Sequence, residues 1–322
     1  MKFFSKNILI TGANGYIGSS VAKKLSTFDC NLFLLSRTGN VPSFVSKLRA
    51  KIKIIKADIT KKNVWTPFLK HINIVFHFAA QTSSQFANNN PYEDLKTNLL
   101  SIVNLIETCQ KNNFSPDIIF AGTVTEVGFT EKGKINEEHK DSPITIYDIH
   151  KLTAEKYLQY YSNQLKRRAT TLRLPNIYGP GPTSSKPDRG IVNLMIKKAL
   201  NDEPITIFGD GSYIRDYLYI KDVVAAFIKA AEHIEKTKEN YYVLGTGIGH
   251  TILQMAQIIK EEVEKLAKKK VTILFSPFPQ NTSRIEYRNF IADSSKFRED
   301  TGWSATISLE EGIERTVDYF ST

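Results

Sequence analysis

The stretch KNILITGANGYIG, residues 6 to 18, decides the fold of this chain. An apolar run ends at Thr11, and Gly12, Gly15 and Gly18 follow before a helical pattern that runs to about Phe28. This order predicts a strand, a tight turn and a helix N-terminus, where backbone N–H groups and the helix dipole bind a phosphate. Gly12 would let the chain turn, Gly15 would let backbone approach a phosphate, and Gly18 would let the helix pack on its strand. The stretch indicates a dinucleotide site, although its first glycine interval is one residue longer than in G-x-G-x-x-G and an ordinary glycine-rich turn is the alternative.

Strands and helices alternate along the first half of the chain. Apolar runs typical of buried parallel strands occur at residues 31–35, 53–57, 73–78 and 117–120. The alternation predicts an α/β fold, a Rossmann-type doubly wound parallel sheet with the cofactor at its carboxyl edge.

The alternation ends near residue 175, which sets the expected domain boundary. Residues 1–175 would form the dinucleotide-binding domain, with later returns to it near 205–208 and 221–244. Residues 176–322 would mainly form a smaller, interleaved C-terminal domain that binds the substrate.

A long amphipathic helix is predicted from Pro91 to about Lys111. Its apolar stripe, expected to lie in the core, comprises Leu95, Leu99, Ile102, Val103 and Ile106. Asn98 interrupts the stripe, so its side chain would either satisfy a neighbouring loop or touch the site.

Composition is that of a globular protein. Of the 322 residues, 41% are hydrophobic and 24% are charged. No run approaches the roughly 18 apolar residues of a membrane-spanning helix. Cys30 and Cys109 are too few for a disulfide framework, and no Cys/His cluster has metal-binding spacing. We therefore expect a cytoplasmic protein without a targeting segment, membrane insertion or a metal.

The net charge is +10. Nucleic acid is one class of partner for such a chain, but no recognition motif accompanies the lysines. A cationic field that attracts an anionic cofactor and a phosphorylated substrate explains the sign equally well. We therefore expect no nucleic-acid partner.

Ser36 and Arg37 end the second predicted strand, where a dinucleotide fold places the adenosine ribose. A carboxylate at this point accepts hydrogen bonds from both ribose hydroxyls and disfavours a 2′-phosphate. A neutral side chain followed by a guanidinium suits a 2′-phosphate, so NADP(H) is the preferred cofactor and NAD(H) the alternative. The competing interpretation is that Arg37 is a solvent-facing loop cation.

Two further strand ends would contribute to the cofactor site. Asp58 and Ile59 follow the third strand, and the carboxylate would receive the adenine amino group. HFAAQ, residues 77 to 81, follows the fourth strand, and its two alanines leave room for a cofactor to lie against the backbone.

Tyr147 and Lys151 begin a later helix and share one face of it, because positions i and i+4 lie above one another. A lysine ammonium beside a tyrosine lowers the phenol pKa, which makes it an acid/base for a secondary alcohol. Thr123, at the end of the fifth strand, could orient the same oxygen. The spacing alone also fits an ordinary helix surface, and it gains weight from the dinucleotide site upstream.

Several ordered motifs together resemble the extended short-chain dehydrogenase/reductases, and more narrowly the NAD-dependent epimerase/dehydratase family that acts on nucleotide-activated sugars. They are TGANGYIGSS, HFAAQ, Thr123 with Tyr147-x-x-x-Lys151, LRLPNIYGPG (172–181), FGDGSYIRDYLYIKDV (208–223) and DSSKF…TGW…SLEEGIERTV (293–317). The match covers nearly the whole chain. The resemblance implies a catalytic trio of Thr123, Tyr147 as acid/base, and Lys151 as its modulator and a ribose ligand. It also implies a homodimer formed through the helices that begin near Pro91 and Ile146.

The resemblance further implies which residues contact the ligands. Asn176 would contact the substrate diphosphate, Arg215 would grip a phosphate with Arg284 as a second clamp, and Asn193 and Leu194 would lie at the base pocket. The expected cofactor contacts are Gly12, Gly15, Tyr16, Ile17, Gly18, Ser36, Arg37, Asp58, Ile59, Phe78, Ala79, Ala80, Asn98, Tyr147, Lys151 and Pro175. The expected contacts with a nucleotide-diphosphate sugar are Gln81, Thr123, Thr125, Asn176, Asn193, Leu194, Arg215 and Arg284.

Two departures from the family pattern bear on the reaction. Family 4,6-dehydratases follow the catalytic threonine with Asp-Glu, whereas this chain has Val124 and Thr125, with Glu126 one place further. Dehydration is therefore disfavoured, unless a one-residue shift brings Glu126 to the site. Ser36 and Arg37 replace the acidic ribose residue usual in NAD-retaining epimerases, which favours a reductase that consumes NADPH.

The first hypothesis is thus NADPH-dependent reduction of a nucleotide-linked 4-keto-(deoxy)hexose in surface-polysaccharide precursor synthesis. The alternative is a 4-epimerase similar to UDP-glucose 4-epimerase, which oxidises C4 and returns the hydride to the other face with its cofactor recycled. A noncatalytic dinucleotide-binding sensor is a third hypothesis, and the intact trio argues against it.

Overall fold

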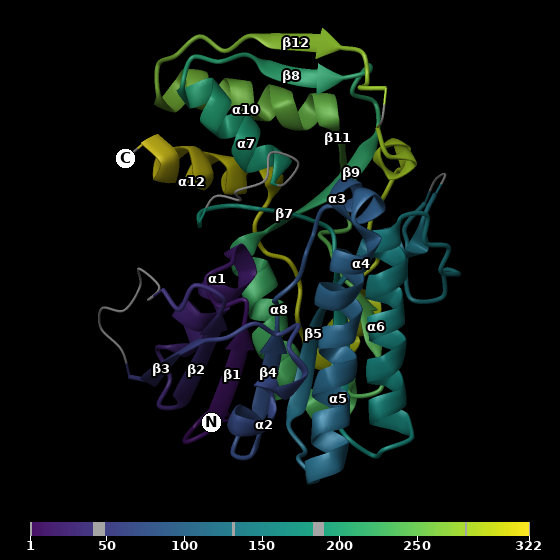
Figure 1. Ribbon diagram of the computed structural model, residues 1–322. Coiled ribbons are helices and arrows are strands. Elements are labelled where there is room, and N and C mark those ends of the chain that lie inside the picture. Colours follow the sequence, from purple (N-terminus) through teal and green to yellow (C-terminus); the bar gives the residue numbers. More distant parts are fainter. Residues whose placement is uncertain (1, 41–48, 131–132, 183–189, 281, 322) are drawn as a thin grey trace.

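A parallel sheet of seven strands runs through the centre of the chain, in the order β10-β6-β5-β4-β1-β2-β3 (Figure 1). It belongs to a computed structural model that describes residues 2–40, 49–130, 133–182, 190–280 and 282–321. Its strands are β1 (Asn7–Thr11), β2 (Asn31–Ser36), β3 (Lys51–Lys56), β4 (Ile74–His77), β5 (Asp117–Thr123), β6 (Ala169–Leu174) and β10 (Tyr241–Val243). The reversal of strand order beside β1 confirms the doubly wound fold expected from the sequence.

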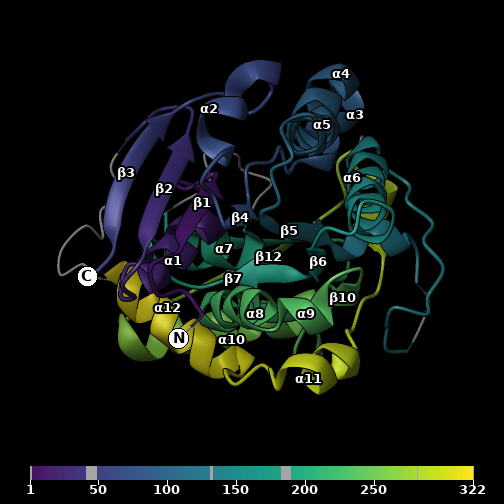
Figure 2. The same ribbon diagram turned by 90° about the horizontal axis from the view of Figure 1, so that it is seen from below.

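Helices cover both faces of this sheet (Figure 2). One face carries α1 (Tyr16–Leu25), α8 (Ile220–Glu232), α9 (Ile234–Thr237) and α11 (Ser295–Thr301). The other carries α2 (Thr66–Leu69), α5 (Ser101–Asn112) and α6 (Ile146–Asn163). Each side has its own apolar core, because a central parallel strand buries side chains on both faces. Cys30 and Cys109 are buried free thiols, one in each core.

The segment before α5 departs from the single regular helix that the sequence predicted. After α3 (Ser84–Asn89), the helix consists of α4 (Pro91–Asp94), a π-helical segment η2 (Leu95–Leu100) and α5. Because a π-helical turn holds an extra residue, the following face is rotated. The predicted stripe is therefore partly wrong. Leu95, Leu99 and Val103 are only half-buried, whereas Asp94, Asn98 and Ser101 are buried.

A second layer lies beyond the carboxyl ends of the large sheet (Figure 1). It contains a three-stranded sheet, β11-β9-β7, and a two-stranded sheet, β12-β8. Its elements are β7 (Asn176–Tyr178), α7 (Ile191–Leu200), β8 (Ile205–Phe208), β9 (Ile214–Tyr219), β11 (Gly249–Thr251), α10 (Ile252–Leu266), β12 (Ile273–Ser276) and α12 (Leu309–Ser321). Short 3-10 helices are η1 (Lys62–Val64), η3 (Val124–Val127) and η4 (Arg284–Tyr287).

The two expected returns to the large sheet have different outcomes. Residues 221–244 do return, since α8 covers one face and β10 pairs with β6. Residues 205–208 do not, because β8 pairs with β12 in the second layer, with Ile205 opposite Ile273. Among the described residues, no helix combines the length and apolarity needed to cross a membrane.

Candidate active site

The turn between β1 and α1 is so tight that two of its positions admit only glycine. Gly12 has φ +64°, and a Cβ there would lie 2.8 Å from the backbone nitrogen of Ala79. A Cβ on Gly18 would lie 2.2 Å from the Gly12 carbonyl oxygen, so α1 packs directly on the turn. Gly15 is the N-cap of α1 and supplies no side-chain cap, an arrangement suited to a phosphate. The helix ends at Leu25, before the predicted end near Phe28.

Thr11 joins this turn to the end of β4. Its Oγ1 accepts hydrogen bonds from the backbone N–H groups of Phe78 and Ala79, both at 3.1 Å. It also lies 3.2 Å from Nδ1 of His77. Since both acceptor positions of the hydroxyl are taken, its own proton goes to His77, which is then neutral with its proton on Nε2. The burial of His77 also favours the neutral ring, because it lowers the pKa of His77 to about 3, and the Lys151 charge acts in the same direction.

The ribose end of the expected cofactor site carries hydroxyls and amides in place of a carboxylate. Ser36 is buried, and its Oγ accepts hydrogen bonds from Asn14 Nδ2 at 3.1 Å and from the Gly39 N–H at 3.0 Å. Asn14 also donates to Thr38 at 3.1 Å. Arg37 is exposed beside them. The sequence argument missed Asn14 and Thr38. The approach of β1 and β2 brings Asn14 to both Ser36 and Thr38.

The remaining expected cofactor contacts lie along the same sheet edge with different degrees of exposure. Asp58 is half-buried, and its Oδ1 accepts from both the N–H and the hydroxyl of Thr60. Ile59 is buried, whereas Ala79 is half-buried and Ala80 is exposed. The other half-buried members are Tyr16, Ile17, Phe78 and Pro175.

Asn98 holds the loop that follows β4. Its Oδ1 accepts from the Gln81 N–H at 3.1 Å, and its Nδ2 donates to the Gln81 carbonyl at 2.8 Å and to Asp94. Of the two roles foreseen for Asn98, the structure therefore has the loop-binding one. The Gln81 side chain, expected at the substrate, turns inward and donates to Asp94 at 2.6 Å and to the Ser83 carbonyl at 2.8 Å.

The expected catalytic trio lies where β5 ends against the first turns of α6. Thr123 is the last residue of β5 and is 8% exposed. Tyr147 is half-buried in the first turn of α6. Lys151, one turn later, is buried, and its Nζ donates to the Ala121 carbonyl at 2.5 Å and lies 3.8 Å from the centre of the Phe120 ring. Burial lowers the pKa of the Lys151 ammonium, and the Glu126 carboxylate opposes that shift.

The arginines of the second layer are arranged differently from the expectation. Arg215, in β9, is buried and donates to the carbonyls of Ile214, Glu286 and Arg288. Arg284 is exposed, with its guanidinium 5.8 Å from the centre of the Phe129 ring. Arg288, not named from the sequence, is buried with Nη2 3.5 Å from Asn176 Oδ1. Burial and the charge of Arg288 lower the pKa of Arg215 to about 9, so two cations lie close together here.

Asn193 fixes the turn after β7. Its Oδ1 accepts from the Gly179 N–H at 3.0 Å, and its Nδ2 donates to the Gly179 carbonyl at 2.8 Å. The hydroxyl of Tyr16 donates to the same carbonyl at 2.6 Å. Asn193 thus links the second layer to the cofactor turn, and Leu194 beside it is half-buried in α7.

The comparison with known proteins identifies the family. A model of the NAD dependent epimerase/dehydratase family matches residues 8–245. The chain belongs to this family. It is 30% identical to UDP-glucose 4-epimerase from Thermotoga maritima, solved with UDP-glucose, over 98% of each chain with a TM-score of 0.86. It is 26% identical to UDP-glucose 4-epimerase from Thermus thermophilus, solved in complex with NAD, over 98% of each chain with a TM-score of 0.82.

A Methanocaldococcus jannaschii protein, named provisionally as a UDP-glucose 4-epimerase, is 29% identical over 97% of both chains. The resemblance found in the sequence motifs is therefore confirmed, and the chain is an enzyme of the epimerase/dehydratase family.

The position of Glu126 bears on whether this member of the family could carry out a dehydration. Glu126 is completely buried, and its Oε1 accepts from the Thr123 N–H at 3.1 Å in a capping box at the start of η3. Its Oε2 lies 3.0 Å from Nε of Arg173. The carboxylate thus faces the protein interior, and the one-residue shift that would have made it a catalytic acid is not seen.

The family trio is accompanied by a residue that the sequence did not single out. Asp148, directly after Tyr147, is buried, and its Oδ1 accepts a hydrogen bond from Thr125 at 2.5 Å. An Asp three residues after Thr145 was readable as a helix-capping signal, but its approach to Thr125 depends on how α6 meets η3.

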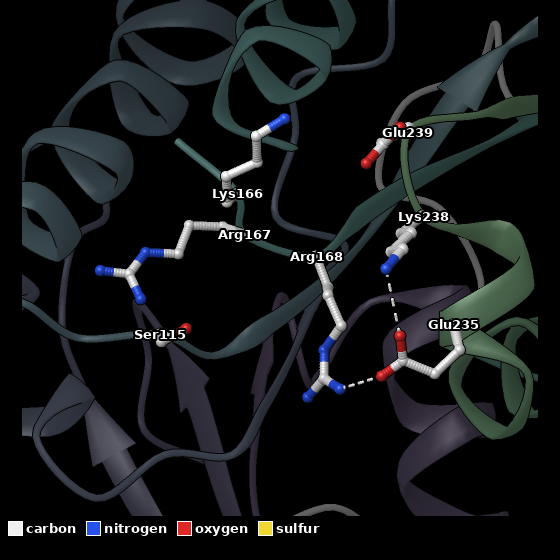
Figure 3. A pocket seen from close by; sticks show the side chains of 7 residues that line it. All are labelled: Ser115, Lys166, Arg167, Arg168, Glu235, Lys238 and Glu239. Carbon is white, nitrogen blue, oxygen red and sulfur yellow. Dashed lines mark hydrogen bonds and ion pairs between the residues drawn. The ribbon is translucent and has the colours of Figure 1, made fainter. Parts of the chain in front are cut away.

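Two cavities of the described residues lie at the other end of the sheet. One, of about 360 Å³, is lined by Ser115, Lys166, Arg167, Arg168, Glu235, Lys238 and Glu239 (Figure 3). Glu235 pairs there with Arg168 and Lys238, so the charges compensate one another. The other, of about 380 Å³, adjoins it through Ser115 and Arg168. Neither contains a residue of the trio, and the parts of the chain that are described hold no cluster of three metal-binding side chains.

Proposed function

We propose that this chain is a nucleotide-sugar 4-epimerase that uses a nicotinamide dinucleotide bound at the β1–α1 turn. The observation that carries the proposal is that Thr123 ends β5, while Tyr147 and Lys151 lie one turn apart at the start of α6, which packs against β5. This end of β5 is at the same sheet edge as the glycine turn. The similarity of this chain, over nearly its full length, to two UDP-glucose 4-epimerases supports the choice of reaction.

The residues present fit a dinucleotide. A Cβ at Gly12 or Gly18 would collide with backbone atoms, so the turn between β1 and α1 can be this tight only with glycine, and α1 begins there without a side-chain cap. When bound, the dinucleotide would accept a hydride from sugar C4 and return it. Ser36, Arg37, Asn14 and Thr38 would hold the ribose end, with NADP(H) preferred and NAD(H) as the alternative.

Side chains of the protein would transfer the C4 hydroxyl proton and bind the sugar oxygen. Tyr147 would take the proton of the C4 hydroxyl and give it back, and Thr123 would hold the oxygen. The Lys151 charge would stabilise the Tyr147 phenolate. Arg215 and Arg288 would hold the diphosphate, since two adjacent guanidinium groups suit two phosphates and Asn176 lies against the second.

A 4-keto reductase is the second candidate. Ser36 and Arg37 favour it, because a 2′-phosphate site is typical of an enzyme that consumes NADPH. Dehydration is less well supported, since Glu126 is buried beneath Thr123.

We also infer a homodimer built on the helices that begin near Pro91 and Ile146. Their outer faces expose large apolar or aromatic side chains, with Tyr92 64%, Ile149 43% and Tyr160 53% exposed. Sedimentation velocity would detect the dimer, and a monomer at all concentrations would exclude it.

The buried free thiols accord with a reducing cytoplasm. We also propose that residues 1–175 form the cofactor domain and residues 176–322 the substrate domain.

Purified protein incubated with UDP-, GDP-, CDP- and dTDP-hexoses, with and without NADPH, tests the function. Interconversion of C4 epimers without net use of cofactor supports the epimerase. Turnover of a 4-keto sugar only with stoichiometric NADPH oxidation would replace it with the reductase. The Tyr147→Phe variant should lose most of either activity, and unchanged turnover would remove the proposed acid/base.

A further inference from the structure

Asp94 is a completely buried residue whose carboxylate contacts three separate segments of the chain. Its Oδ1 accepts hydrogen bonds from Gln81 Nε2 at 2.6 Å and from Asn98 Nδ2 at 2.8 Å. Its Oδ2 lies 2.7 Å from Nδ1 of His150, whose side chain is 13% exposed. Because an ionised carboxylate can only accept hydrogen bonds, His150 Nδ1 is the donor. Asp94 therefore joins the loop after β4 to η2 and to α6.

The π-helical segment brings Asp94 and Asn98 to the same loop. Asp94 ends α4 and is followed directly by η2. Asn98, four residues further along the chain, binds both the N–H and the carbonyl of Gln81. Short π-helical segments inside α-helices are frequent at functional sites. This one buries two polar side chains at the point where α4 and η2 pack against α6 (Figure 1).

The loop that Asp94 holds is also attached to the expected cofactor turn. At its start, Thr11 Oγ1 accepts hydrogen bonds from the backbone N–H groups of Phe78 and Ala79. Gln81 follows two residues later. The loop is thus fixed at one end to the β1–α1 turn and at the other end to Asp94, and a bound dinucleotide would lie along it.

His150 lies between the two members of the trio that α6 carries. Tyr147 precedes it by three residues, about one helical turn, and Lys151 follows it directly. The contact with Asp94 therefore fixes the turn of α6 that presents both side chains. The Asp94 charge also reaches Lys151, because burial lowers the pKa of the Lys151 ammonium while the charges of Glu126 and Asp94 oppose that shift.

We propose that Asp94 is a positioning residue for hydride transfer, since one carboxylate fixes the catalytic face of α6 against the loop along which the dinucleotide would lie. This inference rests on the proposed function. The C4 hydrogen leaves with its electron pair to the dinucleotide while Tyr147 takes the hydroxyl proton, and Asp94 takes part in neither transfer. It acts through His150 and Gln81 on the distance between the reacting groups. A misplacement of about 1 Å can lower the rate of such a step about a hundredfold.

The His150→Leu and His150→Asn variants test the contact, in assays with the nucleotide sugar that the parent protein turns over best. Leu removes the donor to Asp94, whereas the amide of Asn can donate from close to the position of Nδ1. We expect kcat of His150→Leu to fall at least about tenfold, and His150→Asn to recover it to within about threefold of the parent value. KM should change by less than about threefold in both, because the residues expected to bind the nucleotide lie in the second layer.

Asp94→Ala removes the carboxylate from all three segments at once. Its kcat should fall at least as far as that of His150→Leu, and the double variant should be no slower than Asp94→Ala alone, because both changes break the same contact. Glu93→Gln is the matched control: it removes the neighbouring exposed carboxylate, which pairs with Lys96, and should leave kcat unchanged. Melting curves establish that each variant is folded at the assay temperature. Should Asp94→Ala not fold, the two His150 variants decide the question.

Three outcomes would overturn the positioning role alone, provided that the parent turns over a nucleotide sugar. They are a His150→Leu variant that keeps the parent kcat, a His150→Asn variant as slow as His150→Leu, and a double variant whose losses multiply. Failure of the parent to act on any nucleotide sugar would instead overturn the proposed function on which the inference rests.

Discussion

Arg173 Nε lies 3.0 Å from Glu126 Oε2, and neither side chain is exposed to solvent. Arg173 also makes two-pronged contacts with Glu155 and with Asp141, at distances of 2.6 to 3.1 Å. One guanidinium thus lies among three carboxylates beneath the threonine at the end of β5. Burial and the Glu155 charge raise the pKa of Glu126, and Arg173 opposes that rise.

Replacing Arg173 by methionine should therefore be strongly destabilising. The change keeps an apolar stem but leaves buried carboxylates without a counter-charge, and breaking a buried pair in this way costs about 3–5 kcal/mol. Urea denaturation measures the free energy of unfolding. Arg315→Ala removes an exposed pair with Glu311 and should cost below about 0.5 kcal/mol. A loss within about 1 kcal/mol for Arg173→Met would contradict the role given to the cluster.

Glu126→Gln separates a structural from a catalytic carboxylate. Gln keeps an oxygen that can accept from the Thr123 N–H, so we expect kcat to stay within about threefold of the parent value. Steady-state kinetics and a melting curve check this together. Complete loss of turnover at an unchanged melting temperature would mean that Glu126 reaches the substrate after all.

The sequence was sufficient for the parts of the site that depend on local chain geometry. The glycine spacing predicted the β1–α1 turn, and the i,i+4 spacing placed Tyr147 and Lys151 on one face of a helix. It failed where the helix was irregular. Periodicity assumes 3.6 residues per turn, so the π-helical segment at Leu95–Leu100 could not be foreseen and Asp94 was not recognised as buried.

Contacts between segments that are distant in the chain could not be predicted from the sequence either. Arg284 and Arg288 are four residues apart, and nothing in the spacing indicates which one faces Asn176. The 3-10 helix at Arg284–Tyr287 puts the first beside Phe129 and leaves the second buried. Asp148 and Thr125 meet only because α6 packs against the end of β5.

His77 should make the fold acid-sensitive. Its folded pKa of about 3 lies below the ordinary value of 6.5, so the unfolded chain binds more protons between these two values. Stability from this group is full above pH 6.5 and is lost as pH falls, with a slope of up to about 1.4 kcal/mol per pH unit. His77→Asn keeps an acceptor for Thr11 and does not titrate, so its unfolding free energy should depend less steeply on pH.

Denaturant titrations at several pH values between 6.5 and about 4 make this comparison. The exposed His139 is the matched control, because His139→Asn removes a histidine without disturbing the buried contact. Equal slopes for the parent and His77→Asn would show that His77 does not carry the acid sensitivity.

The choice of cofactor should depend on Arg37. At the end of β2, Ser36 is held by Asn14 and by the Gly39 N–H, and Arg37 is exposed. A 2′-phosphate would gain a charge-assisted contact with the guanidinium, so NADPH should bind about tenfold more tightly than NADH, the equivalent of about 1.4 kcal/mol. Arg37→Ala should remove the difference, and Ser36→Asp should reverse it by repelling the phosphate. Fluorescence titration of both reduced cofactors measures the ratio of the NADH and NADPH dissociation constants.

Lys70→Ala is the control for this prediction. It removes the same charge from an exposed position at the opposite edge of the sheet and should leave that ratio unchanged. Equal affinities in the parent protein would leave NAD(H) as the cofactor and remove the main argument for a reductase.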